Sequence, residues 1–181
     1  MSDRDDKELV RRCLEGDRGA FESLVDRYQK TLFNFALRMT HSVSDAEDIA
    51  QSAFLKVYEK LDSFDPNYKF FSWLYRIAVN ESLNFIKHRR QVERLEDDIV
   101  ADEADPEQTY DEDQTTRTVQ SALMELSENH RSVVILKHLQ GFSYAEISGI
   151  LNIPEKKVKS RLFTARVQLK DVLISKGLER E

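Results

Sequence analysis

The sequence is poor in residues that interrupt helices, and it contains one cysteine. Its 181 residues include five glycines and three prolines, spread thinly, which leaves little room for β-hairpins. The single cysteine, Cys13, excludes an internal disulfide and any zinc cluster built from cysteines. We therefore expect an all-α protein. A lone cysteine on an amphipathic helix, such as Cys13, is more often a packing residue than a redox sensor.

Long apolar runs are also absent. No stretch approaches the roughly eighteen apolar residues that a membrane span needs, and the charged start MSDRDDKELV has no apolar signal core. We expect a cytoplasmic protein with no membrane insertion. The four histidines lack a metal-ligand spacing and there is no glycine-rich phosphate loop, so we expect no enzymatic activity, no metal and no cofactor.

Charge is distributed unevenly along the chain. Residues 1–92 contain 15 basic and 15 acidic side chains, residues 93–113 contain 1 and 11, and residues 114–181 contain 11 and 7. The acidic stretch ERLEDDIVADEADPEQTYDED has too little apolar surface to offset its ordering entropy. Apolar residues recur at helical spacing on both sides of it, and the first such stripe comprises Ala20, Leu24, Tyr28, Leu32 and Phe35. The sequence predicts two small helical domains, 1–92 and 115–181, joined by a flexible acidic linker, 93–114.

The second domain contains a predicted helix-turn-helix in GFSYAEISGILNIPEKKVKSRLFTARVQL. Ser143 and Glu146 have the spacing of a capping box, and Ser127 is a candidate cap for the helix before it. Asn152 marks the corner, and Pro154 starts the last helix, where its missing N–H costs least. The predicted inward stripe of that last helix is Val158, Leu162, Ala165 and Leu169.

The other side of the last helix is basic. A helix that enters the major groove needs short polar or basic side chains near its N-terminus. An outward Phe163 among lysines suits contact with a thymine methyl group. The alternative is a basic face that is merely solvated. The residues predicted to bind duplex DNA here are Lys156, Lys157, Lys159, Ser160, Phe163 and Thr164.

A second surface is predicted on the helix in SDAEDIAQSAFLKVYEKL, which Ser44 and Glu47 are expected to cap. Leu55 lies opposite its apolar stripe, beside carboxylates. Such a face suits docking of another helix with basic residues, although isolated exposed leucines are common. The residues of this predicted docking face are Asp48, Gln51, Leu55 and Tyr58.

A third surface is predicted in KFFSWLYRIAVNESLNFIKHRR. Basic and amide side chains recur there every three or four residues, next to a group of aromatic residues. Rings stack on bases while cations track phosphates, so the combination suits an unpaired strand. We expect most of these rings to be core. The shared face comprises Arg76, Asn80, Asn84 and Lys87, followed by His88, Arg89 and Arg90, and the aromatic group comprises Phe70, Phe71, Trp73 and Tyr75.

Taken in order, these motifs resemble the bacterial extracytoplasmic-function RNA polymerase sigma factors. The segment from DAEDIAQSAFLKVYEKL to NFIKHRR resembles the family's second conserved region, and the segment from LSENHRSVVILKHLQGFSYAEI to FTARVQLK resembles its fourth. The resemblance covers nearly the whole chain. It implies that the protein binds core RNA polymerase and recognises the −10 and −35 elements of promoter DNA. It also implies control by an anti-sigma factor until a stress signal arrives.

The resemblance also implies roles for residues. Asp48, Gln51 and Leu55 would grip a helical coiled coil of polymerase, and the segment 63–69 would capture a flipped −10 base. Tyr144 would touch phosphate beside the −35 element. The full set implied for the −10 element is Phe64, Asn67, Lys69, Trp73, Arg76, Asn80, Asn84, Lys87, Arg89 and Arg90.

The sequence departs from the family at the −35 helix. Members often carry arginine where this chain has Lys159 or Thr164, and lysine does not make the rigid bidentate guanine contact of arginine. Two other classes of protein also fit the residues. One is a stand-alone helix-turn-helix regulator that binds a palindromic operator without polymerase. The other is a helical adaptor that holds another protein.

Overall fold

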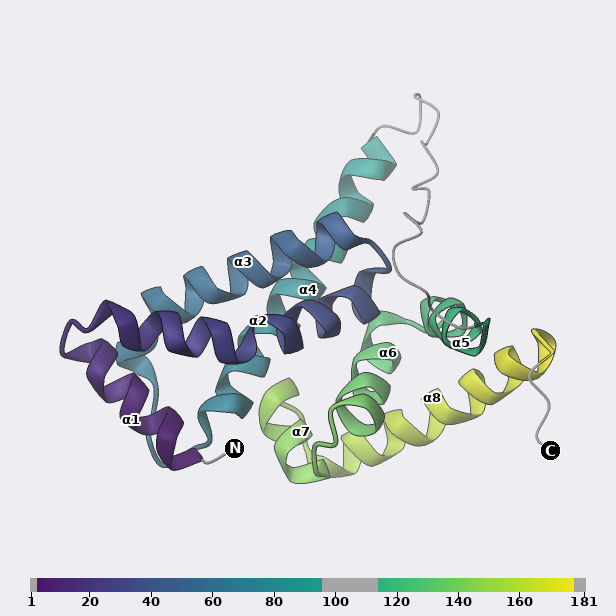
Figure 1. Cartoon of the computed structure of the whole chain (residues 1–181). Coiled ribbons are helices and arrows are strands. Elements are labelled where there is room, and N and C mark those ends of the chain that lie inside the picture. Colours follow the sequence, from purple (N-terminus) through teal and green to yellow (C-terminus); the bar gives the residue numbers. More distant parts are fainter. Residues whose placement is uncertain (1–2, 96–113, 178–181) are drawn as a thin grey trace.

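The computed structural model describes residues 3–95 and 114–177, and all regular structure within these ranges is helical. Figure 1 shows their arrangement. Most of the predicted acidic linker lies outside the described residues. The N-terminal unit comprises α1 (Asp3–Leu14), α2 (Arg18–Thr40), α3 (Val43–Glu59), a 3₁₀ turn η1 (Leu61–Ser63) and α4 (Phe70–Leu95). The C-terminal unit comprises α5 (Gln114–Met124), α6 (Glu128–Val134), a π-helical turn η2 (Ile135–Leu139), α7 (Tyr144–Leu151) and α8 (Glu155–Ser175).

Apolar spacing determines which face of each helix is buried. The predicted stripe of α2 lies in the core: Ala20, Leu24, Tyr28, Leu32 and Phe35 are each at most 3% exposed. Burying one large apolar side chain contributes about 1.5–3 kcal/mol, so this stripe fixes α2 against α3 and α4. In α8 the predicted stripe is likewise confirmed, with Val158, Leu162 and Ala165 buried and Leu169 half-buried.

Capping residues set the helix ends. The capping box of Ser143 and Glu146 and the N-cap at Ser127 are confirmed. The predicted box of Ser44 and Glu47 is wrong, because α3 begins two residues earlier. Ser42 is extended and its side chain accepts from the Asp45 amide at 3.2 Å, directly after His41 closes α2 in the left-handed conformation.

The two units pack against each other, which the sequence analysis does not predict. Phe142, just before α7, stacks on Phe71 of α4 with ring centroids 5.2 Å apart and lies edge-on to Tyr75 at 5.0 Å. Buried Arg131 of α6 donates across the junction to the Met39 carbonyl at the end of α2. One hydrophobic core therefore runs through both units.

Arg131 also ties the C-terminal unit together. Its guanidinium donates to the carbonyls of Leu123, Met124 and Leu126 at 2.9–3.0 Å, around the end of α5. Carbonyls at a helix C-terminus lack partners within the helix and carry partial negative charge, so they accept from a cation readily. A single buried side chain thus links the ends of α2 and α5.

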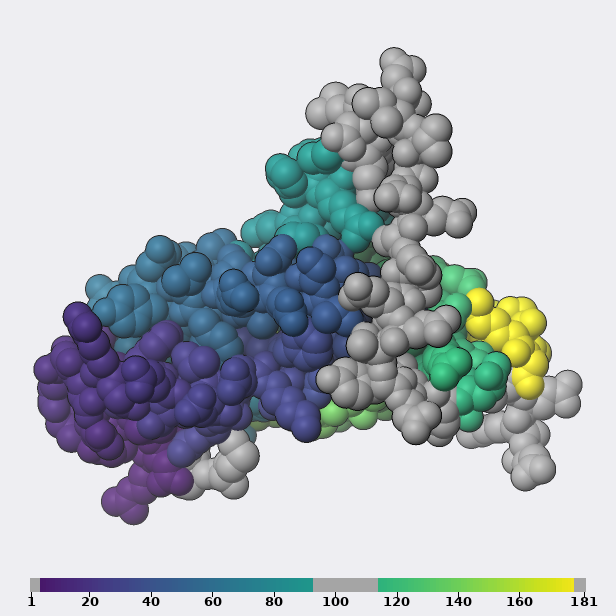
Figure 2. Space-filling model, turned by 45° about the horizontal axis from the view of Figure 1, so that its top comes forward, coloured from purple at the N-terminus to yellow at the C-terminus, as the bar shows by residue number. Residues whose placement is uncertain are grey.

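The arrangement leaves helix ends and faces accessible. The C-terminal end of α4 projects from the rest of the molecule in both the ribbon and the space-filling view (Figures 1 and 2).

None of the helices in residues 3–95 and 114–177 combines the length and the apolar character that a membrane span requires.

Candidate nucleic-acid interfaces and docking groove

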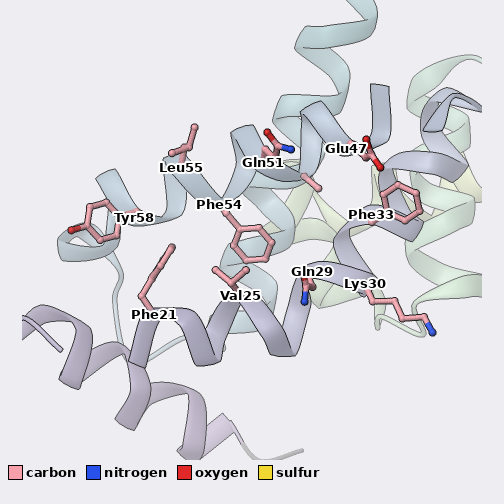
Figure 3. A pocket seen from close by; sticks show the side chains of 11 residues that line it. Phe21, Val25, Gln29, Lys30, Phe33, Glu47, Gln51, Phe54, Leu55 and Tyr58 are labelled. Carbon is pink, nitrogen blue, oxygen red and sulfur yellow. The ribbon is translucent and has the colours of Figure 1, made fainter. Parts of the chain in front are cut away.

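An open groove of about 870 Å³ lies between α2 and α3. Phe54 and Leu55 of α3 both line the groove, and Phe54 points toward α2 whereas Leu55 points away from it (Figure 3). Leu55 and Tyr58 are 65% and 63% exposed, and the Tyr58 ring is held edge-on against Phe21 at 5.1 Å. Gln51 and Asp48 are exposed on the same helix. The structure therefore brings the four predicted docking residues together beside an apolar groove.

The loop before α4 contains three of the residues predicted for the −10 element. Phe64 is 7% exposed and packs on Phe70 and Trp73, with centroids 5.6 and 5.4 Å away. Asn67 is exposed, and its backbone and side-chain nitrogens both donate to Asp65 at 2.9 Å, which folds the loop into a tight turn. Phe64 is thus placed in the core beneath the loop, because its ring fills the aromatic cluster.

The exposed face of α4 contains the predicted row of basic and amide side chains, Arg76, Asn80, Asn84 and Lys87, which we call the polar ladder. Two of its amides, Asn80 and Asn84, line a cleft of about 250 Å³ together with Lys56 of α3 and Lys60, which directly follows α3. Glu81 also lines this cleft, where it accepts from Lys56 Nζ at 2.5 Å and from Ser52 at 2.7 Å. The exposed members of the ladder are Arg76, Asn80, Asn84 and Lys87.

Sequence reasoning missed the two lysines of this cleft. Lys60 follows Lys56 by four residues and caps the end of α3, so the spacing of the two lysines was visible in the sequence. What the sequence does not show is that α3 places them opposite the amides of α4. Beyond the ladder, the two predicted arginines form ion pairs within the protein: Arg89 pairs with Asp45 at 2.6 Å, and Arg90 pairs with Glu128.

The predicted duplex-binding face of α8 is open to solvent. Phe163 is 71% exposed, and the lysines around it are exposed as well. Tyr144, at the start of α7, is half-buried, and the ammonium groups of Lys137 and Lys159 lie 4.9 and 5.5 Å from its ring centroid. The exposed residues of this face are Lys156, Lys157, Lys159, Ser160, Phe163 and Thr164.

Arg166 is a further basic residue of α8 that is not among the predicted duplex-binding residues. Arg166 Nε donates to His138 Nε2 at 3.1 Å. Partial burial, and then the positive charges of Arg166 and Lys137, lower the pKa of His138, so its ring stays neutral and accepts this bond near pH 7. The pair holds the π-helical turn against the outer side of α8.

An ion pair links the −10 loop to α7, the helix before the predicted duplex-binding helix. Lys69 of the loop donates to Glu146 of α7 at 2.8 Å. Together with the bonds from Ser143, this lysine lowers the pKa of Glu146 to about 2, so the carboxylate is ionised at neutral pH. Lys69 is thereby directed toward the C-terminal unit in this arrangement.

Both halves of the chain match models of known protein families. The model described as Sigma-70 region 2 matches residues 24–92, and the one described as Sigma-70, region 4 matches residues 116–169. The chain is 35% identical over 179 residues to the ECF RNA polymerase sigma factor SigW of Bacillus subtilis, covering 92% of this chain and 96% of that protein. It is 36% identical over 173 residues to the ECF RNA polymerase sigma-E factor of Escherichia coli, covering 89% and 90%.

Solved structures are similar across both units. CnrH in complex with the cytosolic domain of CnrY has a TM-score of 0.73 at 29% identity, covering 94% of this chain and 98% of that one. The sigma factor RpoE of Bartonella quintana, in complex with the anti-sigma factor NepR, has a TM-score of 0.74 at 25% identity, covering 88% and 98%.

Proposed function

Because the chain belongs to the extracytoplasmic-function group of the sigma-70 family, we propose that it binds core RNA polymerase and directs it to promoters through −10 and −35 elements. It acts in the cytoplasm as an initiation factor without catalytic activity of its own. One observation carries the proposal: two separate exposed basic faces, on α4 and α8, lie in the two segments that match sigma regions.

In this proposal the docking face of α3 binds polymerase. Leu55 and Tyr58 supply exposed apolar area, and Asp48 supplies a charge that suits a basic helix. The groove beside them accepts apolar side chains of that helix.

The loop and the α4 ladder take the unpaired −10 strand. Extruding a base costs a few kcal/mol of lost stacking, so contacts within the site must supply a binding free energy of similar size. Amides of Asn80 and Asn84 suit base edges, and Lys56 and Lys60 across the cleft suit phosphates. Buried Phe64 supports the loop from below, and exposed Asn67 faces the strand.

The α8 face reads the −35 duplex. Lys156 and Lys157 lie in the first turn, where phosphates are positioned, and Lys159, Ser160 and Thr164 follow where base edges are reached. Tyr144, with two lysines over its ring, contacts phosphate from the preceding helix.

The packed arrangement has to open before both elements are bound. Positions −10 and −35 are about 25 base pairs apart, or about 85 Å at about 3.4 Å per pair. The loop and the start of α7 are instead joined by the bond between Lys69 and Glu146. Polymerase therefore separates the units and sets their spacing.

We further propose that an anti-sigma factor controls the protein. A relative has been solved in complex with the anti-sigma factor NepR, and its likeness to this chain extends over both units. The packed form already directs Lys69 and Arg90 toward the C-terminal unit. An inhibitor that favours this form would keep the −10 loop from DNA.

Transcription with purified components tests the proposal. The chain is mixed with core polymerase and a library of random promoter sequences. We expect transcripts that depend on both the chain and polymerase and that start downstream of two enriched elements. Tight binding to a palindromic site without polymerase would favour the stand-alone regulator instead, and absence of both activities would favour the adaptor.

A further inference from the structure

Among residues 4–92 and 114–177, Asp6 is the one buried acidic side chain, and it is 4% exposed. It lies on α1, ahead of the segment that matches region 2. A carboxylate is costly to bury unless both oxygens are paired. Here Tyr28 donates its hydroxyl to Oδ2 at 2.5 Å, and Arg27 donates to Oδ1 at 2.5 Å.

The hydrogen bond to Asp6 fixes the ring of Tyr28. Burial, and then the bond to Asp6, raise the pKa of Tyr28, so its hydroxyl stays protonated and donates at neutral pH. The ring stacks on Phe71 with centroids 5.4 Å apart and planes inclined by 29°, and it lies 5.9 Å from Phe70. These two phenylalanines open α4, directly after the −10 loop.

Both ends of the loop rest on this aromatic group. Phe64, at the first end, lies edge-on to Phe70 at 5.6 Å, and Phe70 itself follows the last loop residue. Helix α1 also packs against η1, which leads into the loop. The path from Asp6 to the loop is thus continuous, through Tyr28 and then Phe70.

We propose that Asp6 is a positioning residue for the −10 loop, acting through the hydroxyl of Tyr28 to hold the rings on which the loop rests. The inference depends on the proposed function and adds α1 to the part of the chain that captures the strand. The side chain of Asp6 touches no DNA itself.

Strand binding by the assembled holoenzyme tests this role. Affinity is measured for a fluorescent single-stranded oligonucleotide with the −10 sequence obtained from the promoter library, at a temperature where every variant is folded. Tyr28→Phe removes the bond from Tyr28 to Asp6, and Asp6→Ala removes that bond together with the one from Arg27. Each change should weaken binding about tenfold, through the loss of the Tyr28 bond that holds the ring. The double variant should be no weaker than Asp6→Ala, because Asp6→Ala already removes the bond that Tyr28→Phe removes.

The control variant is Val10→Ala, which truncates a buried apolar side chain of α1 and keeps both groups of the bond between Tyr28 and Asp6. It should leave strand affinity unchanged, and all variants should retain polymerase association and −35 duplex binding. Three results would overturn the inference. Val10→Ala could lose as much strand affinity as the other variants at a matched melting temperature, the losses of affinity from the two single changes could multiply in the double variant, or Tyr28→Phe could keep full strand affinity. If Asp6→Ala does not fold, the strand affinities of Tyr28→Phe and Val10→Ala are compared, and a loss in Tyr28→Phe alone supports the inference. A wild-type holoenzyme that binds no −10 strand would instead overturn the proposed function.

Discussion

Exposed apolar side chains next to a carboxylate distinguish the α3 face at the scale of single residues. Leu55 and Tyr58 are each more than 60% exposed, although α3 has a complete buried stripe of its own. Leaving such area in water has no structural benefit, so a partner is expected to cover it. In the proposed docking, the charge of Asp48 on the same helix favours a basic partner.

Asp48→Ala should therefore weaken association with core polymerase without changing DNA preference. A rim charge contributes about 1 kcal/mol, or roughly fivefold in Kd. Asp26→Ala, which removes the same charge from an exposed position on α2, is the matched control. Titration of labelled core polymerase measures both. Equal Kd values for the two variants would show that Asp48 has no specific role.

Two buried charges, Asp6 and Arg131, show what the sequence hides at this scale. Each looks like an ordinary surface residue in a charged helix. Each is buried because partners distant in sequence satisfy it, Tyr28 in the first case and the Met39 carbonyl in the second. Hydrophobic spacing carries no information about such partners.

At the scale of elements, local rules predicted most of the fold. Periodic apolar residues located α2 and α8, and the sequence of Ser143, Glu146 and Asn152 located both ends of α7. The error at Ser44 arose because a second serine, two residues earlier, satisfies the same rule. Helix α1 was not predicted from apolar spacing, because it contains few apolar residues.

The capping box of α7 gives a prediction about pH. The pKa of Glu146 is lowered to about 2, first by Lys69 and then by Ser143. Its ionised form therefore stabilises the fold above the ordinary pKa near 4.5, and this contribution is lost as pH falls toward 2. Glu146→Gln should reduce stability at pH 7 by about 1 kcal/mol and flatten the dependence between pH 5 and 2.

Urea unfolding at several pH values measures this effect. Glu155→Gln removes a carboxylate from the start of the next helix and serves as the control. The difference between wild type and Glu146→Gln should shrink as pH falls, whereas that for Glu155→Gln should not follow the same curve. A difference for Glu146→Gln that stays constant with pH would show that its charge has no such effect.

At the scale of the whole molecule, the packing of the two units was the feature that could not be read from the sequence. Phe142 stands between Gly141 and Ser143, so it belongs to no apolar period. Its burial depends on Phe71 and Tyr75 in the other unit. Phe71 also stacks on Tyr28, so Phe142 joins an aromatic group of the N-terminal unit.

Phe142→Ala should open the free chain, because it removes the ring at the centre of this junction. A compact chain of this length has a radius of gyration of about 16 Å. Small-angle scattering should show wild type nearer that value and Phe142→Ala clearly larger, with the helix content retained. Phe163→Ala, which truncates an exposed ring of the same unit, should leave the radius unchanged. Equal radii for wild type and Phe142→Ala would contradict a closed free state.

The central claim is that α4 and α8 read different promoter elements within one holoenzyme. Selection from a random promoter library with wild type, Asn80→Ala and Lys159→Ala tests it most directly. Asn80→Ala should change base preference within the −10 element alone, and Lys159→Ala within the −35 element alone, with the spacing between the elements unchanged. Unaltered preference in both variants, or a shift of both elements by either one, would contradict the account.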